Sequence, residues 1–325
     1  MVYNKYIGII GGTGTIGSII VKYLLQLQTH FHVLIGGRRS IKEISMSTFY
    51  NSERLKYNQM NYNNDVELDN FCSQCLLVIN AVGPSFKIND KIALHALRNN
   101  CHYIDIGGYG ILRDLLKPYE KSIEAQKLCF IIGVGWMPGI SGVFSKTIIE
   151  THLNSPENTN FNIYYGAVDN WSYSSTYDLA ASSMGKTRSY VYSHGKEIQV
   201  SPFRYTHHKF FPFIGHKKIC MPSFDEQLTQ LATSLKQIRK ISTFIMLNDY
   251  ISMGKFMFIK IFYKHNLNKA TLMLQDDYQR LVKKENKWGS VICQVSKIEP
   301  ERKIDTFYYC LLYTSPSPRD STSSR

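Results

Sequence analysis

The amino-acid sequence predicts an α/β domain built on a doubly wound parallel sheet, followed by a second domain of the α+β class. Three observations support this prediction. Apolar runs alternate with helical patterns through the first part of the chain, a glycine-rich turn follows the first run, and alternating strand patterns dominate the second part. A chain of 325 residues has room for two domains, which we expect at residues 1–145 and 146–310.

The strand candidates of the first domain are continuous apolar runs. Such runs are typical of strands that are buried on both faces of a parallel sheet. They lie at Tyr6–Ile10, His32–Gly37, Leu76–Gly83, His102–Gly108 and Leu128–Gly135.

Helical patterns occupy the segments between these strands. The expected helices are Thr15–Gln28, Asn89–Asn99 and Ile111–Lys127. In the first of them, an apolar face with helical spacing is expected to be buried. That face consists of Ile16, Ile19, Ile20, Tyr23, Leu24 and Leu27. The less regular segment Ile41–Tyr62 is expected to hold a helix and a weak strand near "LKYNQM".

Strand alternation and hairpin turns characterise the second domain. The expected strand regions are Phe161–Asp169, Arg188–Val200 with a turn at Gly195, and Trp288–Tyr309 with a turn at "EPER". Asp225–Ile241 has the pattern of an amphipathic helix. This half is expected to be a substrate or dimerisation domain. Residues 311–325 resemble translated sequencing-adapter sequence, and we interpret them as a non-native tail outside the fold.

The composition disfavours several classes of protein. The formal net charge is +13, but the basic residues are scattered, which favours a diffuse basic surface or a small anionic ligand over a nucleic acid. The start of the chain lacks the pattern of a signal peptide. Asp249, Lys255 and Lys260 interrupt the most apolar stretch, Ile241–Phe262, so we interpret it as buried helix and strand and expect no membrane partner.

The cysteine content fits reduced thiols in a cytoplasmic protein. The chain has seven cysteines, an odd number, and most lie in apolar segments. The motif "CSQC", from Cys72 to Cys75, has no second pair nearby. Small packing residues are the favoured interpretation, with metal or redox chemistry as the alternative, and we expect no metal site.

The glycine-rich turn predicts a dinucleotide-binding site. Gly12, Gly14 and Gly17 form a G-x-G-x-x-G motif directly after a strand and at the start of a helix. The first glycine permits a tight turn, the second lets the backbone approach a pyrophosphate, and the third lets the helix pack on the strand. The helix start then offers N–H groups to the phosphates. Thr13, Thr15 and Ile16 are expected to contact the cofactor on the same loop.

The end of the second strand indicates which dinucleotide is bound. NAD sites usually end this strand with an acidic residue, but this chain has Arg38 and Arg39 after Gly36 and Gly37. Two guanidinium groups suit a ribose 2′-phosphate, so we expect NADP(H) rather than NAD(H).

A further loop is expected beside the ribose and nicotinamide. The run "NAVGPS" ends the next strong strand, and ligands in open α/β sheets lie beyond the carboxyl ends of the strands. The predicted contacts are Ala81, Val82, Gly83 and Pro84. A plain loop between strand and helix is the alternative.

Five segments together resemble the NADP-binding domain of the saccharopine dehydrogenase-like family. They are "IIGGTGTIGS", "IGGRR", "VINAVGPS", "HYIDIGG" and "GVGWMPGISG", in this order over roughly the first 145 residues. The resemblance implies a Rossmann fold and an NADP-dependent oxidoreductase. In this family hydride is transferred to or from a C=N bond of an imine or amino acid, in a cleft between the domains.

The resemblance also implies roles for individual residues. Asp105, in "YIDIGG", matches a family aspartate near the substrate, where it could hold an ammonium group or relay a proton. A helix cap or turn residue is the alternative. The backbone N–H groups of Gly133–Gly142 could face the nicotinamide or a substrate carboxylate, and Trp136 could line the pocket or the core. Tyr177 could donate a proton, and Lys186 and Arg188 could bind a substrate carboxylate, against an alternative of solvated surface.

Two rival functions stay open at this point. The glycine motif also resembles short-chain dehydrogenases, whose catalytic Tyr and Lys lie four residues apart on a helix. Tyr192–Lys196 and Tyr205–Lys209 have that spacing, but neither lies in a helical pattern. A non-catalytic NADPH sensor needs the same loop and no catalytic residues. The expected partner is a small, carboxylate-bearing substrate, and a homodimer is an open alternative to a monomer.

Overall fold

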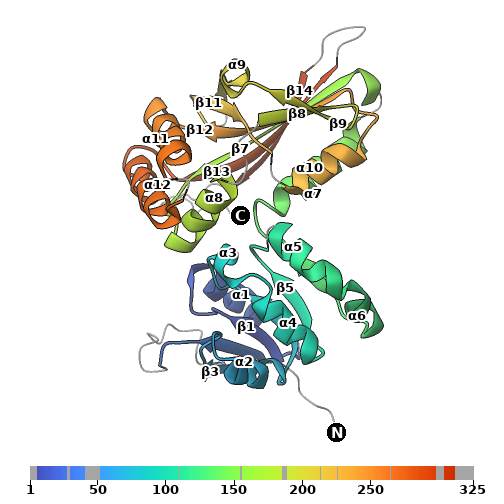
Figure 1. The fold of residues 1–325 in the computed structure, drawn as a ribbon, viewed down its shortest axis with the longest axis vertical. Helices are drawn as coiled ribbons and strands as arrows, with labels where there is room; N and C mark the ends of the chain where they lie inside the picture. Colours follow the sequence, from blue (N-terminus) through green and yellow to red (C-terminus); the bar gives the residue numbers. More distant parts are fainter. Residues whose placement is uncertain are drawn as a thin grey trace, which may run out of the picture. The chain divides into compact units, whose positions relative to one another are not determined.

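The computed structural model describes ten stretches of the chain. They are residues 6–27, 30–40, 52–108, 110–153, 156–184, 189–212, 214–224, 226–263, 265–297 and 304–311. The chain divides into two compact units, Met1–Gly135 and Trp136–Arg325 (Figure 1). The sequence placed the boundary at residue 145, which lies within helix α7 (Ile140–His152) of the second unit.

The described part of the first unit contains a six-stranded sheet in the order β3-β2-β1-β4-β5-β6. All its neighbouring strands are parallel. The strands are β1 (Tyr6–Ile10), β2 (Val33–Gly37), β3 (Leu55–Gln59), β4 (Cys75–Asn80), β5 (His102–Asp105) and β6 (Phe130–Ile132). This is the strand order of a doubly wound Rossmann sheet, and it confirms the predicted fold class.

The helices of the first unit differ from the sequence prediction at three places. They are α1 (Thr15–Gln26), α2 (Asp65–Cys72), α3 (Ser85–Ile88), α4 (Lys91–Arg98), α5 (Gly110–Leu116) and α6 (Glu120–Ala125). The single helix expected at Ile111–Lys127 is interrupted by a 3₁₀ turn, Lys117–Tyr119, because Pro118 lacks the N–H of a continuous helix. Helices α2 and α3 were not expected. The signal for α2 is a polar cap, in which the Asn64 side chain accepts hydrogen bonds from the amides of Val66 and Glu67.

The predicted buried face of α1 is wrong by part of a turn. Ile16, Ile19, Tyr23 and Leu27 are exposed. Gly17 and Val21 are buried instead, with Ile20 and Leu24 packed against the core of β1 and β2. The close contact of Gly17 with the preceding loop fixes the rotation of the helix, so apolar residues one position away face outward.

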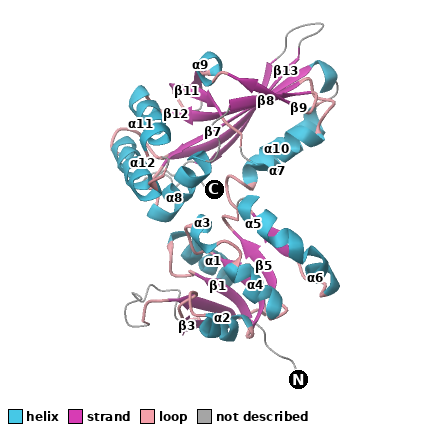
Figure 2. Cartoon of the chain, in the orientation of Figure 1, coloured by secondary structure: helices cyan, strands magenta, loops and turns pink. Residues whose placement is uncertain are grey.

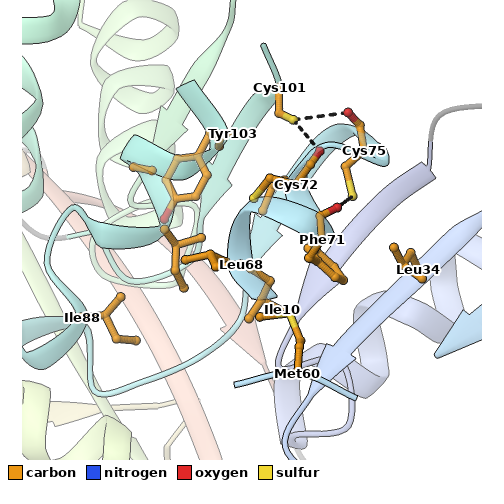
Figure 3. Close-up of a cluster of buried hydrophobic side chains, with 14 of the residues drawn as sticks. Ile10, Leu34, Met60, Leu68, Phe71, Cys72, Cys75, Ile88, Cys101 and Tyr103 are labelled. Atoms are coloured by element: carbon orange, nitrogen blue, oxygen red, sulfur yellow. Dashed lines mark hydrogen bonds between the residues drawn. The ribbon is translucent and has the colours of Figure 1, made fainter. Parts of the chain in front are cut away.

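The thiols of the "CSQC" motif belong to a buried cluster under the sheet (Figure 3). The Cys101 thiol donates hydrogen bonds to the carbonyl groups of Cys72 (3.1 Å) and Cys75 (3.2 Å), and the Cys75 thiol donates to that of Phe71 (3.2 Å). Burial raises the pKa of Cys72 well above its usual range. These contacts support the packing interpretation. No group of three or more potential metal ligands occurs among the residues with described positions.

The second unit is built on an eight-stranded mixed sheet, as counted over its described residues. Strands β10-β11-β12-β7-β13-β14 follow one another, and β8 pairs with β12 and with β9. The bounds are β7 (Thr159–Val168), β8 (Ser189–Ser193), β9 (Lys196–Val200), β10 (His207–Phe211), β11 (His216–Pro222), β12 (Lys240–Leu247), β13 (Trp288–Lys297) and β14 (Ile304–Leu311). The expected α+β class and the hairpins β8–β9 and β13–β14 are confirmed.

Helices flank this second sheet in Figure 2. They are α7, α8 (Tyr173–Met184), α9 (Pro202–Tyr205), α10 (Glu226–Ser234), α11 (Tyr250–Phe262) and α12 (Leu267–Val282), with a 3₁₀ turn at Pro156–Asn158. The apolar stretch Ile241–Phe262 forms most of β12 and all of α11, as strand and helix. Over the described ranges, no helix combines the length and apolar character required to cross a membrane.

Candidate functional site

The glycine loop between β1 and α1 has the geometry of a phosphate-binding turn. Gly11 has a φ of +85°, which favours glycine, and the Gly14 amide donates to the Gly11 carbonyl at 2.9 Å. Gly14 is the N-cap of α1, and no side chain caps the helix. The first turn also contains no acidic residue. The amide groups at this helix start are therefore suited to an anionic group.

The space around the motif glycines tests whether a pyrophosphate fits. A Cβ atom on Gly17 would lie 2.2 Å from the Gly11 carbonyl oxygen, and one on Gly12 would lie 2.9 Å from the Ile35 side chain. Gly17 is therefore required for the close approach of α1 to the glycine loop, and Gly12 for the close approach of that loop to β2. A Cβ atom on Gly14 would approach only the Gly11 carbonyl oxygen, at 3.2 Å, and the rest of the space around that position is open. The residues present fit the three roles that the motif assigns to its glycines.

The arginines after β2 are exposed and held in place through their backbone. The Tyr57 hydroxyl donates to the Arg39 carbonyl at 2.6 Å, and the Gln59 amide donates to the Arg38 carbonyl at 3.4 Å. Within the described stretches, neither guanidinium group forms an ion pair. The site thus presents two cationic side chains at the strand end where an NAD site usually has a carboxylate.

The loop after β4 lies directly against the glycine loop. The Ala81 amide donates to the Ile10 carbonyl at 2.9 Å, and a Cβ atom on Gly11 would lie 2.9 Å from the Val82 side chain. Ala81, Val82, Gly83 and Pro84 are all half-buried. The structure therefore brings two of the predicted cofactor-binding segments together at the carboxyl edge of the sheet.

Asp105 ends the neighbouring strand β5 and is almost completely buried, with 2% of its surface exposed. Its Oδ2 atom accepts hydrogen bonds from the Tyr103 hydroxyl (2.5 Å) and the Asn80 amide (2.8 Å). Burial raises the pKa of Asp105, and this effect exceeds the opposing effects of Tyr103, Asn80 and nearby backbone amides. A buried carboxylic acid with a raised pKa is suited to binding a cation or exchanging a proton.

A small pocket, with a cavity volume of about 10 Å³, lies beside this carboxylate. Its lining combines Asp105 with polar and apolar side chains of β4, α3 and α5. The other lining residues are Asn80, Ser85, Phe86, Ile88, Asn89, Gly108, Ile111 and Leu112. The Oδ1 atom of Asp105 is buried and has no partner at hydrogen-bond geometry, although the amides of Gly107 and Gly108 lie close enough to favour its charged form. The surroundings of Oδ1 therefore differ from those of Oδ2, and the sequence could not show this difference.

Asn80 and Tyr103 are site residues that sequence reasoning missed. The expected strands ran on to Gly83 and Gly108, whereas the structure ends them at Asn80 and Asp105. A signal was present, because alternate strand residues share a face, and Tyr103 and Asp105 are two positions apart. The pairing of Asn80 with Asp105 depends on strand register, which the sequence does not specify.

The remaining predicted residues lie in the second unit, apart from Gly133–Gly135 at the end of the first. Tyr177 is buried in α8, with its ring 6.1 Å from that of Tyr173. Lys186 and Arg188 fall outside the described residues. In the Gly133–Gly142 segment, the Gly139 amide donates to Gln227 Oε1 at 2.8 Å, so a protein side chain already uses it.

Trp136 lies against the core of the second unit, and its indole N–H is buried without a partner. This placement supports the core alternative for its side chain.

The two Tyr–Lys pairs do not form the arrangement of a short-chain dehydrogenase. Tyr192 belongs to β8 and Lys196 to β9, on opposite sides of a hairpin turn. Tyr205 ends α9, and Lys209 lies in β10. Neither pair lies on one helix.

The fold and the glycine loop define the first unit as a dinucleotide-binding domain of the Rossmann type. Residues 7–129 match the family described as the saccharopine dehydrogenase NADP binding domain. The match covers less than half of the chain, and it supports an NADP-binding domain of the saccharopine dehydrogenase type in the first unit, with NADP as its cofactor.

Solved structures extend the similarity to the fold of the whole chain. The apo saccharopine dehydrogenase (L-Glu forming) of Saccharomyces cerevisiae matches with a TM-score of 0.62 and 14% identity, covering 96% of this chain and 87% of that one. At this identity the match shows the fold alone. A short-chain dehydrogenase/reductase of Veillonella parvula with NADP has a TM-score of 0.30 and 19% identity, covering 39% of this chain and 67% of that one.

GenD2 from gentamicin A biosynthesis, with NAD, has a TM-score of 0.43 and 7% identity, covering 94% of this chain and 72% of that one. The last two similarities are too weak to bear on function. A comparison with curated protein sequences finds no match.

Proposed function

We propose that the chain is an NADP(H)-dependent oxidoreductase that transfers hydride to or from a carbon–nitrogen bond of an imine or amino-acid substrate. One observation carries this proposal. The phosphate-binding glycine loop and the buried Asp105 carboxylate lie at the same edge of one sheet, with a pocket beside the carboxylate. Ligands of open α/β sheets bind at this edge.

The cofactor-binding residues divide into three groups. The backbone amides at Gly12–Gly17 bind the pyrophosphate, with Thr13, Thr15 and Ile16 on the same turn. Arg38 and Arg39 bind the 2′-phosphate through charge-assisted hydrogen bonds. The loop Ala81–Pro84 contacts the ribose and nicotinamide side. When bound, NADPH supplies the hydride.

The reduction of a C=N bond also requires one proton at nitrogen for each hydride at carbon. Asp105 can supply that proton or hold the ammonium form of the amine, since its pKa is raised by burial. Tyr177 as a proton donor and Arg188 as the partner of a substrate carboxylate complete the proposed set. The guanidinium group of Arg188 would bind the substrate carboxylate and so orient the substrate.

The nucleotide preference provides the first experiment. The double variant Arg38→Ala/Arg39→Ala should weaken NADPH binding by about 30-fold or more in titration calorimetry, because each lost hydrogen bond to a charged group is worth about 1.5–3 kcal/mol. Binding of NADH should change by less than about threefold, since it has no 2′-phosphate. Arg98→Ala, an exposed arginine on α4, is the matched control. Equal losses for both nucleotides would contradict the assignment of the 2′-phosphate.

Turnover provides the second experiment. NADPH consumption is followed by absorbance with panels of primary amines combined with 2-oxo acids or aldehydes. Consumption that requires both components supports imine reduction. Tight NADPH binding without turnover across the panels would instead favour a non-catalytic NADPH sensor, the alternative that shares the same glycine loop.

A further inference from the structure

Two polar residues of the candidate site have no assigned part in the function proposed above. We infer that Asn80 and Tyr103 are positioning residues for the Asp105 carboxylate. Their hydrogen bonds fix one carboxylate oxygen, and the other oxygen remains available to contact the ligand. This inference rests on the proposed function for the chemistry that Asp105 performs. The geometry that supports it lies entirely within the first unit.

Strand register brings the three residues together. In the parallel pair β4–β5, Asn80 is the register partner of Asp105, and both end their strands. Tyr103 lies two positions before Asp105, so its side chain is on the same face of β5. The backbone of Asp105 is fixed as well, since its carbonyl accepts from the Val134 amide at 3.0 Å. The carboxylate therefore has little freedom to choose other partners.

The two oxygens of the carboxylate differ in their surroundings. Oδ2 accepts from the Tyr103 hydroxyl at 2.5 Å and from the Asn80 amide at 2.8 Å, which satisfies its two lone pairs. Oδ1 is buried without a hydrogen-bond partner, and the pocket lies beside Asp105. A ligand that donates a hydrogen bond can satisfy only Oδ1. A proton taken up by the carboxylate also belongs on Oδ1, because Oδ2 already accepts two donors.

Asn80 connects this carboxylate to the loop on the cofactor side. Its Oδ1 atom accepts from the Val82 amide at 3.0 Å, while its NH₂ group donates to Asp105. The Val82 N–H can only donate, so it fixes which end of the Asn80 amide faces Asp105. Val82 belongs to the loop that lies against the glycine loop. A displacement of that loop would therefore alter the hydrogen bonding of Asp105.

Tyr103 acts as a donor and not as an acid in this arrangement. Burial raises the pKa of Tyr103 well above its ordinary value, and the neighbouring Asp105 raises it further. The phenol therefore keeps its proton and directs it to the carboxylate. Asp105 is the only charged side chain among the described residues that line the pocket, so its ionisation depends on burial, on these two donors and on the nearby backbone amides of Gly107 and Gly108.

The test measures the ionisation of Asp105 directly, without a substrate. Carboxyl carbons of aspartate are labelled with ¹³C, the Asp105 resonance is assigned with Asp105→Asn, and its pKa is read from an NMR titration of the full chain. Tyr103→Phe and Asn80→Ala should each raise the pKa of Asp105 by about one unit or more, because each removes a hydrogen bond to the charged form. Tyr119→Phe, an exposed tyrosine of the same unit, is the control and should leave it unchanged.

The outcomes separate a positioning role from a structural one. If either variant unfolds at a lower temperature but leaves the Asp105 titration unchanged, that residue is structural and the inference is wrong for it. Tyr103→Phe removes one oxygen only and Asn80→Ala a separate group, so a folding failure of one leaves the other as the test. If NADPH does not bind the parent protein, the proposed function fails, while the titration still decides the positioning role.

Discussion

Replacement of Gly17 by alanine should destabilise the first unit, although alanine is the better helix former. Alanine in a helix interior is worth about 1 kcal/mol over glycine. At Gly17, however, the new Cβ would lie 2.2 Å from the Gly11 carbonyl oxygen, and 2.8 Å from both the Gly11 carbonyl carbon and the Gly12 Cα. Ordinary contact begins at 3.4 Å, and these neighbours are backbone atoms that cannot rotate away. Overpacking costs about 1–3 kcal/mol, and contact with fixed backbone atoms places this site in the upper part of that range, about 2–3 kcal/mol. We expect a net loss of about 1–2 kcal/mol and weaker NADPH binding.

Gly254→Ala is the matched control for this prediction. Gly254 lies inside α11, and a Cβ there would meet no atom within 4 Å. The same chemical change should therefore stabilise the second unit by about 0.5–1 kcal/mol. Opposite signs for two Gly→Ala changes in helices would show that contact, and not propensity, decides the effect at Gly17.

Urea unfolding with two probes distinguishes the two units. The tryptophans of the chain are Trp136, Trp171 and Trp288, all in the second unit, so their fluorescence reports that unit, whereas far-UV circular dichroism reports both. Gly17→Ala should lower the transition seen by circular dichroism and leave the fluorescence transition in place. If Gly17→Ala instead raises stability as Gly254→Ala does, the contact geometry of the glycine loop is wrong.

Three further predictions concern charged groups. Burial opposes the ionisation of Asp249, but hydrogen bonds, led by that from Arg280, outweigh it and lower its pKa to about 2. The stability from this depressed pKa is present above the unfolded value of about 3.9 and lost as pH falls. Asp249 is about one-third exposed, so solvent screening reduces the effect, and urea titrations from about pH 4 to about pH 2 should show a loss of about 1 kcal/mol that Asp249→Asn reduces. Glu285→Gln removes the carboxylate that pairs at 2.8 Å with the buried Lys218 ammonium. This change should lower the free energy of unfolding of the second unit by about 2–3 kcal/mol, as measured by tryptophan fluorescence in urea. An unchanged urea midpoint would contradict this expectation. Asp105 has a raised pKa, so its contribution to stability falls as pH rises between the unfolded and folded values. Asp105→Asn should thus be at least as stable as the parent in thermal unfolding at neutral pH, and a large loss would contradict the burial argument.

The sequence predicted the elements whose formation depends on local patterns. Strand β1 and the start of α1 follow from an apolar run and a glycine motif, which act over a few residues. The rotation of α1 could not be predicted in the same way, because the contact of Gly17 with Gly11 competes with the apolar spacing of Ile16, Ile19 and Tyr23. Helix α2 was missed because its cap at Asn64 carries more of the signal than its apolar periodicity does.

In the candidate site too, the sequence predicted the parts that depend on local patterns and missed those that depend on strand register. Segments with backbone roles, such as the glycine loop and Ala81–Pro84, are recognisable because glycine and proline have distinctive conformations. The hydrogen bonds of Asp105 with Asn80 and Tyr103 depend on the register of β4 against β5 and on where each strand ends. The sequence marked Asp105 but could not show which of its oxygens would face a ligand.

The burial of the thiols determines which cysteines can react with electrophilic reagents. Of the six cysteines whose surroundings are described, only Cys129 is exposed. Burial raises the pKa of Cys220 and of Cys293 to about 12, and that of Cys72 further still, so these sulfurs stay protonated and unreactive. Within this described set, a maleimide or iodoacetamide reagent thus encounters a single accessible thiol, and a dye attached to Cys129 would label the first unit at one known position.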